Sequence, residues 1–496
     1  MADTPWIDDR SLGPAAARGT VVVTIFRVVG TFVSLGTTAI LARILVPSDF
    51  GIIDLAGTLT ALLAVTGDLG LSLATVQSEE IDDRQVSNLW WLSSAFGLLL
   101  WILSALSGPL LVILYNEPAL YWVAGTLGLN FFLGGMAAQP HALLRRRLEF
   151  RKIGVSDVAG KVVGLAVGLG VALVGGSYWA LVANVLVASS VRLLFVFRYS
   201  RITILPPQRG TGIAPMVRMG GWYVGFSFLN YIARHLDDIL VGRFLGSAVL
   251  GIYARAYRLY LLPQSLVTGI LGKVSLPVLS RMAGEDDRFT HAYLELVQVT
   301  VLTACTAGGW LAVLAPEVIL IVLGDQWMEA VPVFRVFAIV GVFQPLHSTT
   351  AWIYTSLGRT DRMFRWEIVP AVLLSIGFVI GLRWGLMGMV YAYAAVWLGG
   401  LFLPGLWYAL RLTTIGLGGL FQAILPHFGV MAVSTGGMLL ARGILTSHDA
   451  GPLLTMLSTL AVGTILHILA ALLLTRETMD RIRLLLSHPS GGTREG

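Results

Sequence analysis

The chain has 496 residues, of which 56% are hydrophobic and only 12% are charged; its formal net charge is +6 and its mean hydropathy +0.79. Soluble domains carry about 25% charged residues, and a soluble protein this apolar would expose large apolar patches to water. The composition therefore excludes an ordinary soluble protein and predicts an all-α membrane protein. The single cysteine, Cys305, excludes an internal disulfide and a multi-cysteine metal site.

Apolar segments long enough to cross a bilayer, which takes about 20 helical residues, recur along the whole chain. The start of the chain is polar and acidic and shows no processing site, so the first apolar segment is expected to remain as a span. We predict about 14 transmembrane helices. They cover residues 19–41, 50–76, 88–107, 119–141, 154–174, 178–197, 216–236, 247–276, 289–314, 331–357, 366–383, 386–410, 419–441 and 451–475.

Basic residues concentrate in alternate loops. With the N-terminus inside, the inner loops hold the clusters at residues 145–152, 198–209, 359–365 and 476–483. The outer loops hold little more than Arg43, Arg243, Arg383 and Arg442. Because Lys and Arg are enriched in cytoplasmic loops, this bias predicts that both termini are cytoplasmic.

The sequence repeats itself. Residues 40–52 align without gaps on residues 240–252, and each copy covers a turn between two predicted helices. An even number of spans separates the copies, so the repeats run parallel, as in transporters that rock two lobes about a central site. We expect an N-terminal lobe, a hinge-like cytoplasmic linker, a C-terminal lobe, and two accessory helices with a cytoplasmic tail, at residues 1–197, 198–215, 216–410 and 411–496.

Several kinds of chemistry are absent from the sequence. Residues 154–161 imitate a phosphate-binding loop, but the spacing is one residue too long and Val162 replaces the Ser or Thr that would hold magnesium. No zinc-protease motif, nucleophile elbow or dinucleotide fingerprint occurs, and the predicted outer loops are short for a polymerase or ligase. We therefore expect no enzymatic activity, no cofactor and no nucleic-acid partner.

Ionisable residues inside spans are costly and mark candidate functional positions. Arg27 lies near the middle of the first span with no acid one turn away, so it needs a cavity, an anionic ligand or a partner on another helix. In the seventh span, Arg234 can pair with Asp238, four residues on. Asp54 and Asp68 share a face of the second span to within about 40°. They are candidates for ion coupling, with helix capping or pairing to Arg27 as the alternative.

The eighth span carries Arg255 and Arg258, three residues apart, with no acid within a turn. Tyr253, Tyr257 and Tyr260 flank them. Guanidinium groups bind phosphate oxygens bidentately, and aromatic rings can lie against sugar rings. This pattern favours a diphosphate-sugar ligand, with snorkelling to the interface as the alternative.

The fifth span combines a charge pair with small residues. Asp157 and Lys161 stand four residues apart, and Gly160, Gly164 and Gly168 form a stripe of small side chains. Such stripes let two helices approach closely. We interpret both the pair and the stripe as structural.

Several segments taken together resemble the bacterial polysaccharide-exporter family. Its members are Wzx-type flippases for lipid-linked oligosaccharides within the MATE-like superfamily. The resemblance covers nearly the whole chain in the same order. The segments that carry it are residues 43–51, 67–71, 238–246, 251–257, 276–281, 315–318 and 324–327.

The resemblance implies two six-helix lobes related by the parallel repeat, with a central cavity, plus two accessory C-terminal helices. It implies a multi-pass protein of the bacterial inner membrane that moves an undecaprenyl-diphosphate-linked oligosaccharide from the cytoplasmic to the periplasmic leaflet. Membrane lipids, a polysaccharide polymerase and export machinery would be its other partners. In relatives the cavity is cationic, and the candidates here are Arg27, Arg234, Arg255, Arg258 and Tyr257.

Three alternatives remain open. A small-molecule or drug antiporter of the same fold would prefer acidic residues in its cavity, which Asp54 and Asp68 allow. A peptidoglycan-precursor flippase would share fold and mechanism and differ only in the headgroup. A membrane-embedded polymerase or ligase would need a periplasmic domain or an acidic metal-binding motif, and neither is evident in the sequence.

Overall fold

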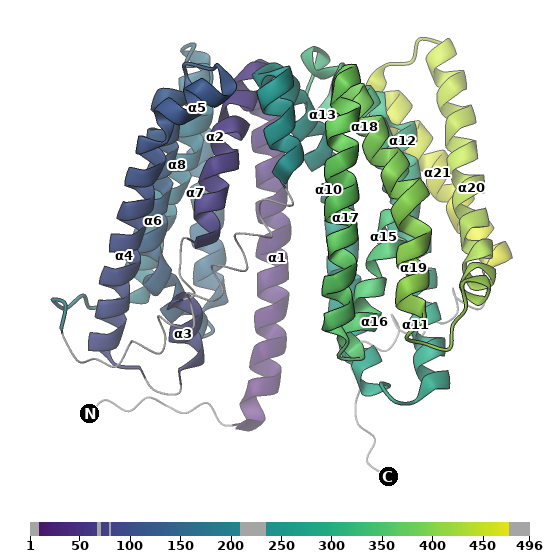
Figure 1. Ribbon diagram of the computed structural model, residues 1–496, viewed down its shortest axis with the longest axis horizontal. Coiled ribbons are helices and arrows are strands. Elements are labelled where there is room, and N and C mark those ends of the chain that lie inside the picture. Colours follow the sequence, from purple (N-terminus) through teal and green to yellow (C-terminus); the bar gives the residue numbers. More distant parts are fainter. Residues whose placement is uncertain (1–8, 67–70, 79–80, 209–234, 476–496) are drawn as a thin grey trace. The chain divides into compact units, whose positions relative to one another are not determined.

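The computed structural model describes residues 9–66, 71–78, 81–208 and 235–475, and within these ranges the secondary structure is entirely helical (Figure 1). Contacts divide the chain into two compact units, Met1–Gly251 and Ile252–Gly496, called unit 1 and unit 2 below. Within each unit the long helices run alongside one another as a bundle, as expected where lipid leaves no water to satisfy an open backbone.

Unit 1 is built on two strongly packed helix pairs, α4 with α6 and α7 with α8, joined by contacts of α6 with α8 and of α1 with α7. Residues 235–245 are also helical and precede α10. The helices are α1 (Asp9–Ala42), α2 (Pro47–Thr66), α3 (Leu71–Gln77), α4 (Asp83–Leu106), α5 (Gly108–Tyr115), α6 (Leu120–Arg146), α7 (Phe150–Leu173) and α8 (Trp179–Ser200).

Unit 2 contains shorter helices, because turns and short 3-10 or π segments interrupt several spans. The last two long helices, α20 and α21, pack on each other. The helices are α10 (Ser247–Arg281, whose first turn belongs to unit 1), α11 (Asp286–Thr300), α12 (Thr306–Val313), α13 (Ala315–Val322), α14 (Ala330–Val340), α15 (Gln344–Ser348), α16 (Thr350–Ser356), α17 (Thr360–Gly381), α18 (Gly385–Ala395), α19 (Phe402–Leu410), α20 (Leu417–Ser447) and α21 (Pro452–Leu474).

Ten helices of the described residues are long and apolar enough to cross a membrane, or eleven if a pair bent by 46° counts as one span. One of the ten, Thr360–Leu410, is interrupted by a 3-10 turn where Gly385 has φ +71°, and α17 packs back on α18. Two predicted spans, 50–76 and 216–236, fall partly outside the described residues. The multi-pass helical architecture is confirmed, while the number of 14 and the two-lobe repeat stay predictions.

The small-residue stripe on α7 allows the close helix approach that the sequence predicts. A Cβ atom on Gly160 would lie 2.5 Å from the carbonyl oxygen of Ala188, and one on Gly164 would lie 2.6 Å from that of Asn184. A Cβ on Gly168 would meet the Asn184 side chain as well. Only glycine lets α7 and α8 approach this closely, so the stripe determines their packing.

The two copies of the repeated turn touch each other inside unit 1. A Cβ on Gly51 of α2 would collide with the backbone carbonyl of Ser247, and a Cβ on Gly251 would collide with that of Pro47. Pro47 and Ser247 occupy equivalent positions of the aligned copies, as do Gly51 and Gly251. The contact is therefore reciprocal, as at an interface between two like elements.

The predicted linker begins as a strap on unit 1. The amide N–H of Leu205 donates to Ser87 Oγ (3.0 Å), and the indole of Trp91 donates to the Leu205 carbonyl (3.0 Å). The Asn88 side chain bonds both ways with the Gln208 backbone, donating at 2.6 Å and accepting at 2.9 Å. The stretch 203–208, called the strap below, is thus bound to α4. α4 therefore satisfies backbone polar groups of these residues, and the hinge role of the predicted linker stays a prediction.

Candidate functional site

A cavity of about 740 Å³ opens among α1, α6, α7 and α8 of unit 1. Its lining combines aromatic and aliphatic side chains with four cationic groups, one carboxylate and one histidine. We call it the cationic cavity. Its ionisable lining residues are Arg27, His141, Arg145, Asp157, Lys161 and Arg192.

Arg27 lies where the sequence predicts, on the part of α1 that faces this cavity. Among the described residues it has no ion-pair partner, so its guanidinium is available to a ligand. Of the three outcomes expected for Arg27, the structure favours a cavity. The one carboxylate in the lining, Asp157, instead lies 3.9 Å from Arg192, at the limit of an ion pair, and both side chains are more than 40% exposed.

Lys161 bonds to α1 instead of to its predicted partner. Its Nζ donates to the carbonyl oxygen of Gly30 at 2.9 Å, and a Cβ on Gly30 would lie only 3.2 Å from that nitrogen. The predicted pairing of Asp157 with Lys161 is therefore wrong. The glycine leaves room for the ammonium to reach across to the neighbouring helix, while Asp157 lies nearer Arg192 of α8.

Three consecutive arginines at the end of α6 point in three directions, since successive residues of a helix are rotated by about 100°. Arg145 lines the cationic cavity. Arg146 donates to the carbonyl of Thr75 (3.0 Å) at the end of α3, and Arg147 donates to that of Ser200 (2.8 Å) at the end of α8. Arg146 and Arg147 thus cap helix ends, and only Arg145 adds charge to the cavity.

The arrangement suits an anionic ligand. Lys161 is eleven residues beyond Phe150, the first residue of α7, which is roughly 16 Å along the helix and about half of the hydrocarbon thickness. An anion at that depth would be costly without compensating charge, and guanidinium groups compensate it with strong, directional hydrogen bonds. No cluster of metal-ligating side chains occurs in the described part of the chain.

On α10, the arginines and tyrosines of the predicted site do not form the single open face that their spacing in the sequence predicts. Arg255 is buried, only 7% exposed, while Arg258 is exposed, so they do not share one open face. Tyr253 is 2% exposed, and it and Tyr257 pack on the ring of Phe337, with centroids 5.5 and 5.2 Å away. Tyr253 is therefore a core side chain that cannot lie against a sugar. The half-buried Tyr257 stays a candidate with the two arginines.

The other candidates are only partly described. Asp54 is buried on α2, at 7% exposure. Asp68 and Arg234 lie outside the described residues, so neither the shared face of the two aspartates nor the pairing of Arg234 with Asp238 is tested. His235 Nδ1 lies 3.3 Å from Asp238 Oδ2, which gives this carboxylate a neighbour that the sequence did not identify.

Sequence reasoning missed three of the four cations of the cationic cavity as site residues. Arg192 lies inside the predicted span 178–197, so the rule that flags ionisable residues in spans applies to it as it does to Arg27. The spacing of Lys161 predicts an intrahelical pair with Asp157 instead. Arg145 falls in a predicted loop, and nothing in the sequence separates it from Arg146 and Arg147.

A family model described as "Polysaccharide biosynthesis protein" matches residues 40–332. The chain is 27% identical over 468 residues to the succinoglycan biosynthesis transport protein ExoT of Rhizobium meliloti, covering 91% of this chain and 92% of that protein. It is 25% identical to the lipopolysaccharide biosynthesis protein WzxC of Escherichia coli, over 69% and 70% of the two chains. Identity to the teichuronic acid biosynthesis protein TuaB of Bacillus subtilis is 24%, over 75% and 78%.

Solved structures share the fold at low sequence identity. The lipid II flippase MurJ in an inward closed conformation matches with a TM-score of 0.68 at 14% identity, over 93% of this chain and all of that chain. An inward-facing multidrug transporter of the MATE family matches with a TM-score of 0.59 at 14% identity, over 81% of this chain and 95% of that chain. These structures therefore share the membrane architecture of this chain.

Proposed function

Because the chain belongs to the polysaccharide biosynthesis protein family, we propose that it is a flippase for undecaprenyl-diphosphate-linked oligosaccharide repeat units. It would carry them across the bacterial inner membrane for exopolysaccharide, capsule or O-antigen synthesis. The names of ExoT, a transport protein, and of WzxC support transport in such a pathway. The shared fold with a lipid II flippase supports movement of a lipid-linked headgroup.

The cationic cavity carries this proposal. Arg27, Arg145, Lys161 and Arg192 outnumber the single carboxylate of the lining. A diphosphate cannot enter hydrocarbon unaided, because burying an uncompensated charge is prohibitive. A hydrated cavity with several cations would replace the lost water, while the prenyl chain stays in lipid. The protein itself need make or break no covalent bond.

We further propose that transport proceeds by alternating access of the two predicted lobes, with both termini in the cytoplasm. The reciprocal contact of the repeated turns supports a structural repeat. On the second repeat, Arg234, Arg255, Arg258 and Tyr257 stay candidates for binding the diphosphate. Asp54 and Asp68 would couple transport to an ion gradient.

A drug antiporter is the second candidate, and the MATE-type fold favours it. Such a carrier would prefer acidic groups to receive cationic drugs. The excess of cations in the cavity argues against this function and for an anionic substrate.

The test uses purified protein in liposomes and a fluorescent undecaprenyl-diphosphate oligosaccharide whose movement between leaflets is followed. We expect Arg27→Gln/Arg192→Gln to slow protein-dependent movement at least tenfold, roughly the loss of one charge-assisted hydrogen bond. The control, Arg84→Gln/Arg151→Gln, removes two exposed charges of unit 1 outside the cavity lining and should retain wild-type rates.

Two results would count against the proposal. Equal rates in the wild type and both double variants, with folding retained, would remove the cationic cavity from the mechanism. No movement in the wild type, across several lipid-linked oligosaccharides and with an imposed ion gradient, would reject the flippase itself in favour of the antiporter.

A further inference from the structure

Unit 2 holds a second cavity, of about 620 Å³, between α12, α14 and α20. Its walls are mostly apolar, with Ile339, Val342, Met431 and Leu439 among them. Two arginines, Arg335 and Arg442, also line it, and none of its lining residues is acidic. We call it the lipid-facing cavity, because apolar lining residues such as Leu439 are exposed at the surface of the unit.

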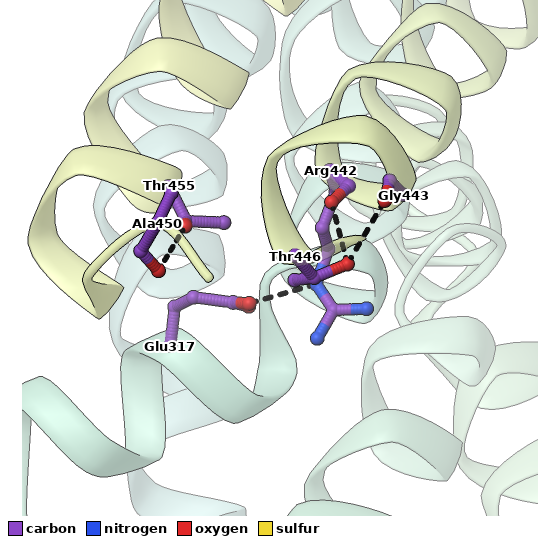
Figure 2. Close-up of polar contacts among 6 residues, drawn as sticks. All are labelled: Glu317, Arg442, Gly443, Thr446, Ala450 and Thr455. Carbon is purple, nitrogen blue, oxygen red and sulfur yellow. Dashed lines mark hydrogen bonds and ion pairs between the residues drawn. The ribbon is translucent and has the colours of Figure 1, made fainter. Parts of the chain in front are cut away.

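Arg442 is oriented by an ion pair with a buried carboxylate (Figure 2). The Nε of Arg442 donates to Glu317 Oε1 on α13 at 2.8 Å, and the side chain of Glu317 is only 6% exposed. No contact to the two Nη groups is drawn in Figure 2, and within the described residues they have no hydrogen-bond partner. Glu317 thus orients Arg442 through Nε and leaves the two Nη groups for a ligand.

Both arginines lie close to a helix end, and the ends of spanning helices border the headgroup region. Arg335 is five residues from Ala330, where α14 begins, and Arg442 is five residues from Ser447, where α20 ends. At about 1.5 Å per residue, each is roughly 7–8 Å from a helix end. The polar headgroup region occupies about that thickness on each side of the hydrocarbon core.

The apolar walls run out to the surface of the unit. Ile339 is 44% exposed and Leu439 is 56% exposed, and both also line the cavity. In a membrane protein, exposed apolar side chains at this position contact acyl chains. The cavity therefore joins a cationic end at headgroup depth to an apolar trough that opens into lipid.

We propose that the lipid-facing cavity binds one phospholipid. Its phosphate accepts hydrogen bonds from Arg335 and from the Nη groups of Arg442, and one acyl chain lies along the apolar wall. The two guanidinium groups, of which one is partly offset by Glu317, complement a phosphate bearing one negative charge. A free anion would leave the apolar walls in water, so a lipid fits the whole cavity. This site is separate from the cationic cavity and does not depend on the flippase proposal.

A glycine in the lining of the lipid-facing cavity offers a test, because a larger side chain there would fill the cavity. A Cβ added to Gly436, a lining residue of α20, would meet nothing within 4 Å. A leucine there would project into the cavity, and leucine favours a helix more than glycine does. Gly443 is its matched control: it is on the same helix, also has nothing within 4 Å and is not part of the lining.

The experiment measures binding of phosphatidylglycerol to delipidated full-length protein in detergent by native mass spectrometry. Diacylglycerol with the same acyl chains serves as the ligand without phosphate. We expect Arg335→Gln and Gly436→Leu each to weaken binding at least tenfold, and Arg335→Lys to recover part of the loss. Gly443→Leu and Arg383→Gln, which removes an exposed arginine outside the lining, should bind as the wild type does.

Several outcomes would overturn the proposal. Diacylglycerol bound as tightly as phosphatidylglycerol would remove the phosphate contact. Displacement by millimolar inorganic phosphate would show an anion site and not a lipid site. Unchanged binding in Gly436→Leu, with the variant folded, would place the lipid elsewhere.

Discussion

The buried carboxylate of Glu317 should make the stability of unit 2 depend on Arg442 (Figure 2). The two groups lie 2.8 Å apart, and their side chains are 6% and 25% exposed. At an effective dielectric constant of about 20, two charges at this distance attract by roughly 6 kcal/mol, most of which offsets their desolvation. Removing one partner leaves the other charge buried, which costs about 3–5 kcal/mol for a fully buried pair. The exposure of Arg442 places the expected loss near the lower end.

The assay is thermal unfolding in detergent of Arg442→Met, Glu317→Gln and the double variant. Methionine keeps the apolar stem of the arginine side chain and removes its charge. We expect Arg442→Met to lose about 3 kcal/mol and the double variant to recover roughly 2 kcal/mol of it, because no buried charge then remains. The control is Arg288→Met, which breaks a pair with Glu285 that is 2.7 Å long but more than half exposed. It should lose less than about 1 kcal/mol. Equal losses in Arg442→Met and the double variant would refute the reasoning, since Glu317 would then be neutral or solvated.

Two further predictions concern unit 1. Asn88→Ala removes both hydrogen bonds to Gln208. We expect amide hydrogen exchange across the strap to become faster, with a loss of about 1–2 kcal/mol in the free energy of protection and little change in the global melting temperature. Unaltered exchange would mean that Asn88 does not hold the strap. Gly164→Leu should prevent folding, seen as loss of monodisperse protein on size exclusion, because its side chain meets Asn184 and α8. Gly170→Leu, on the same helix with nothing within 4 Å, should fold, and equal behaviour of the two variants would contradict the packing argument.

The features that the sequence predicts well are those that depend on one helix alone or on a steric requirement. Arg27 is conspicuous because no neighbour on its own helix can neutralise it. Gly160 and Gly164 are conspicuous because small residues at this spacing have one common use in membranes. In both cases the side chain's own helix contains the information: the structure confirms the close packing at the glycines and places Arg27 in a cavity lining, while its role in binding stays a prediction.

The features that the sequence predicts poorly depend on how the helices are rotated about their axes. In lipid, the buried and the exposed faces of a helix are both apolar, so hydrophobic periodicity does not fix rotation. Asp157 and Lys161 are suitably spaced to pair, yet Lys161 bonds to Gly30 of another helix. Tyr253 likewise faces Phe337 in the core and not a cavity. Breaks that contain a charged residue are easier to predict, because the 3-10 turn at Leu382–Trp384, which includes Arg383, falls at the boundary between the predicted spans 366–383 and 386–410.

The contact between the two repeated turns supports a repeat that is weak in the sequence. Few residues of the two copies are identical, and the shared glycines, Gly51 and Gly251, stand at the same position in each. In the structure, each glycine is covered by the backbone of the opposite copy, at Ser247 and at Pro47. The two glycines therefore serve the same contact, which occurs twice. Because the atoms that a Cβ would meet belong to the backbone, this contact requires a glycine on each side and leaves the neighbouring side chains free to differ.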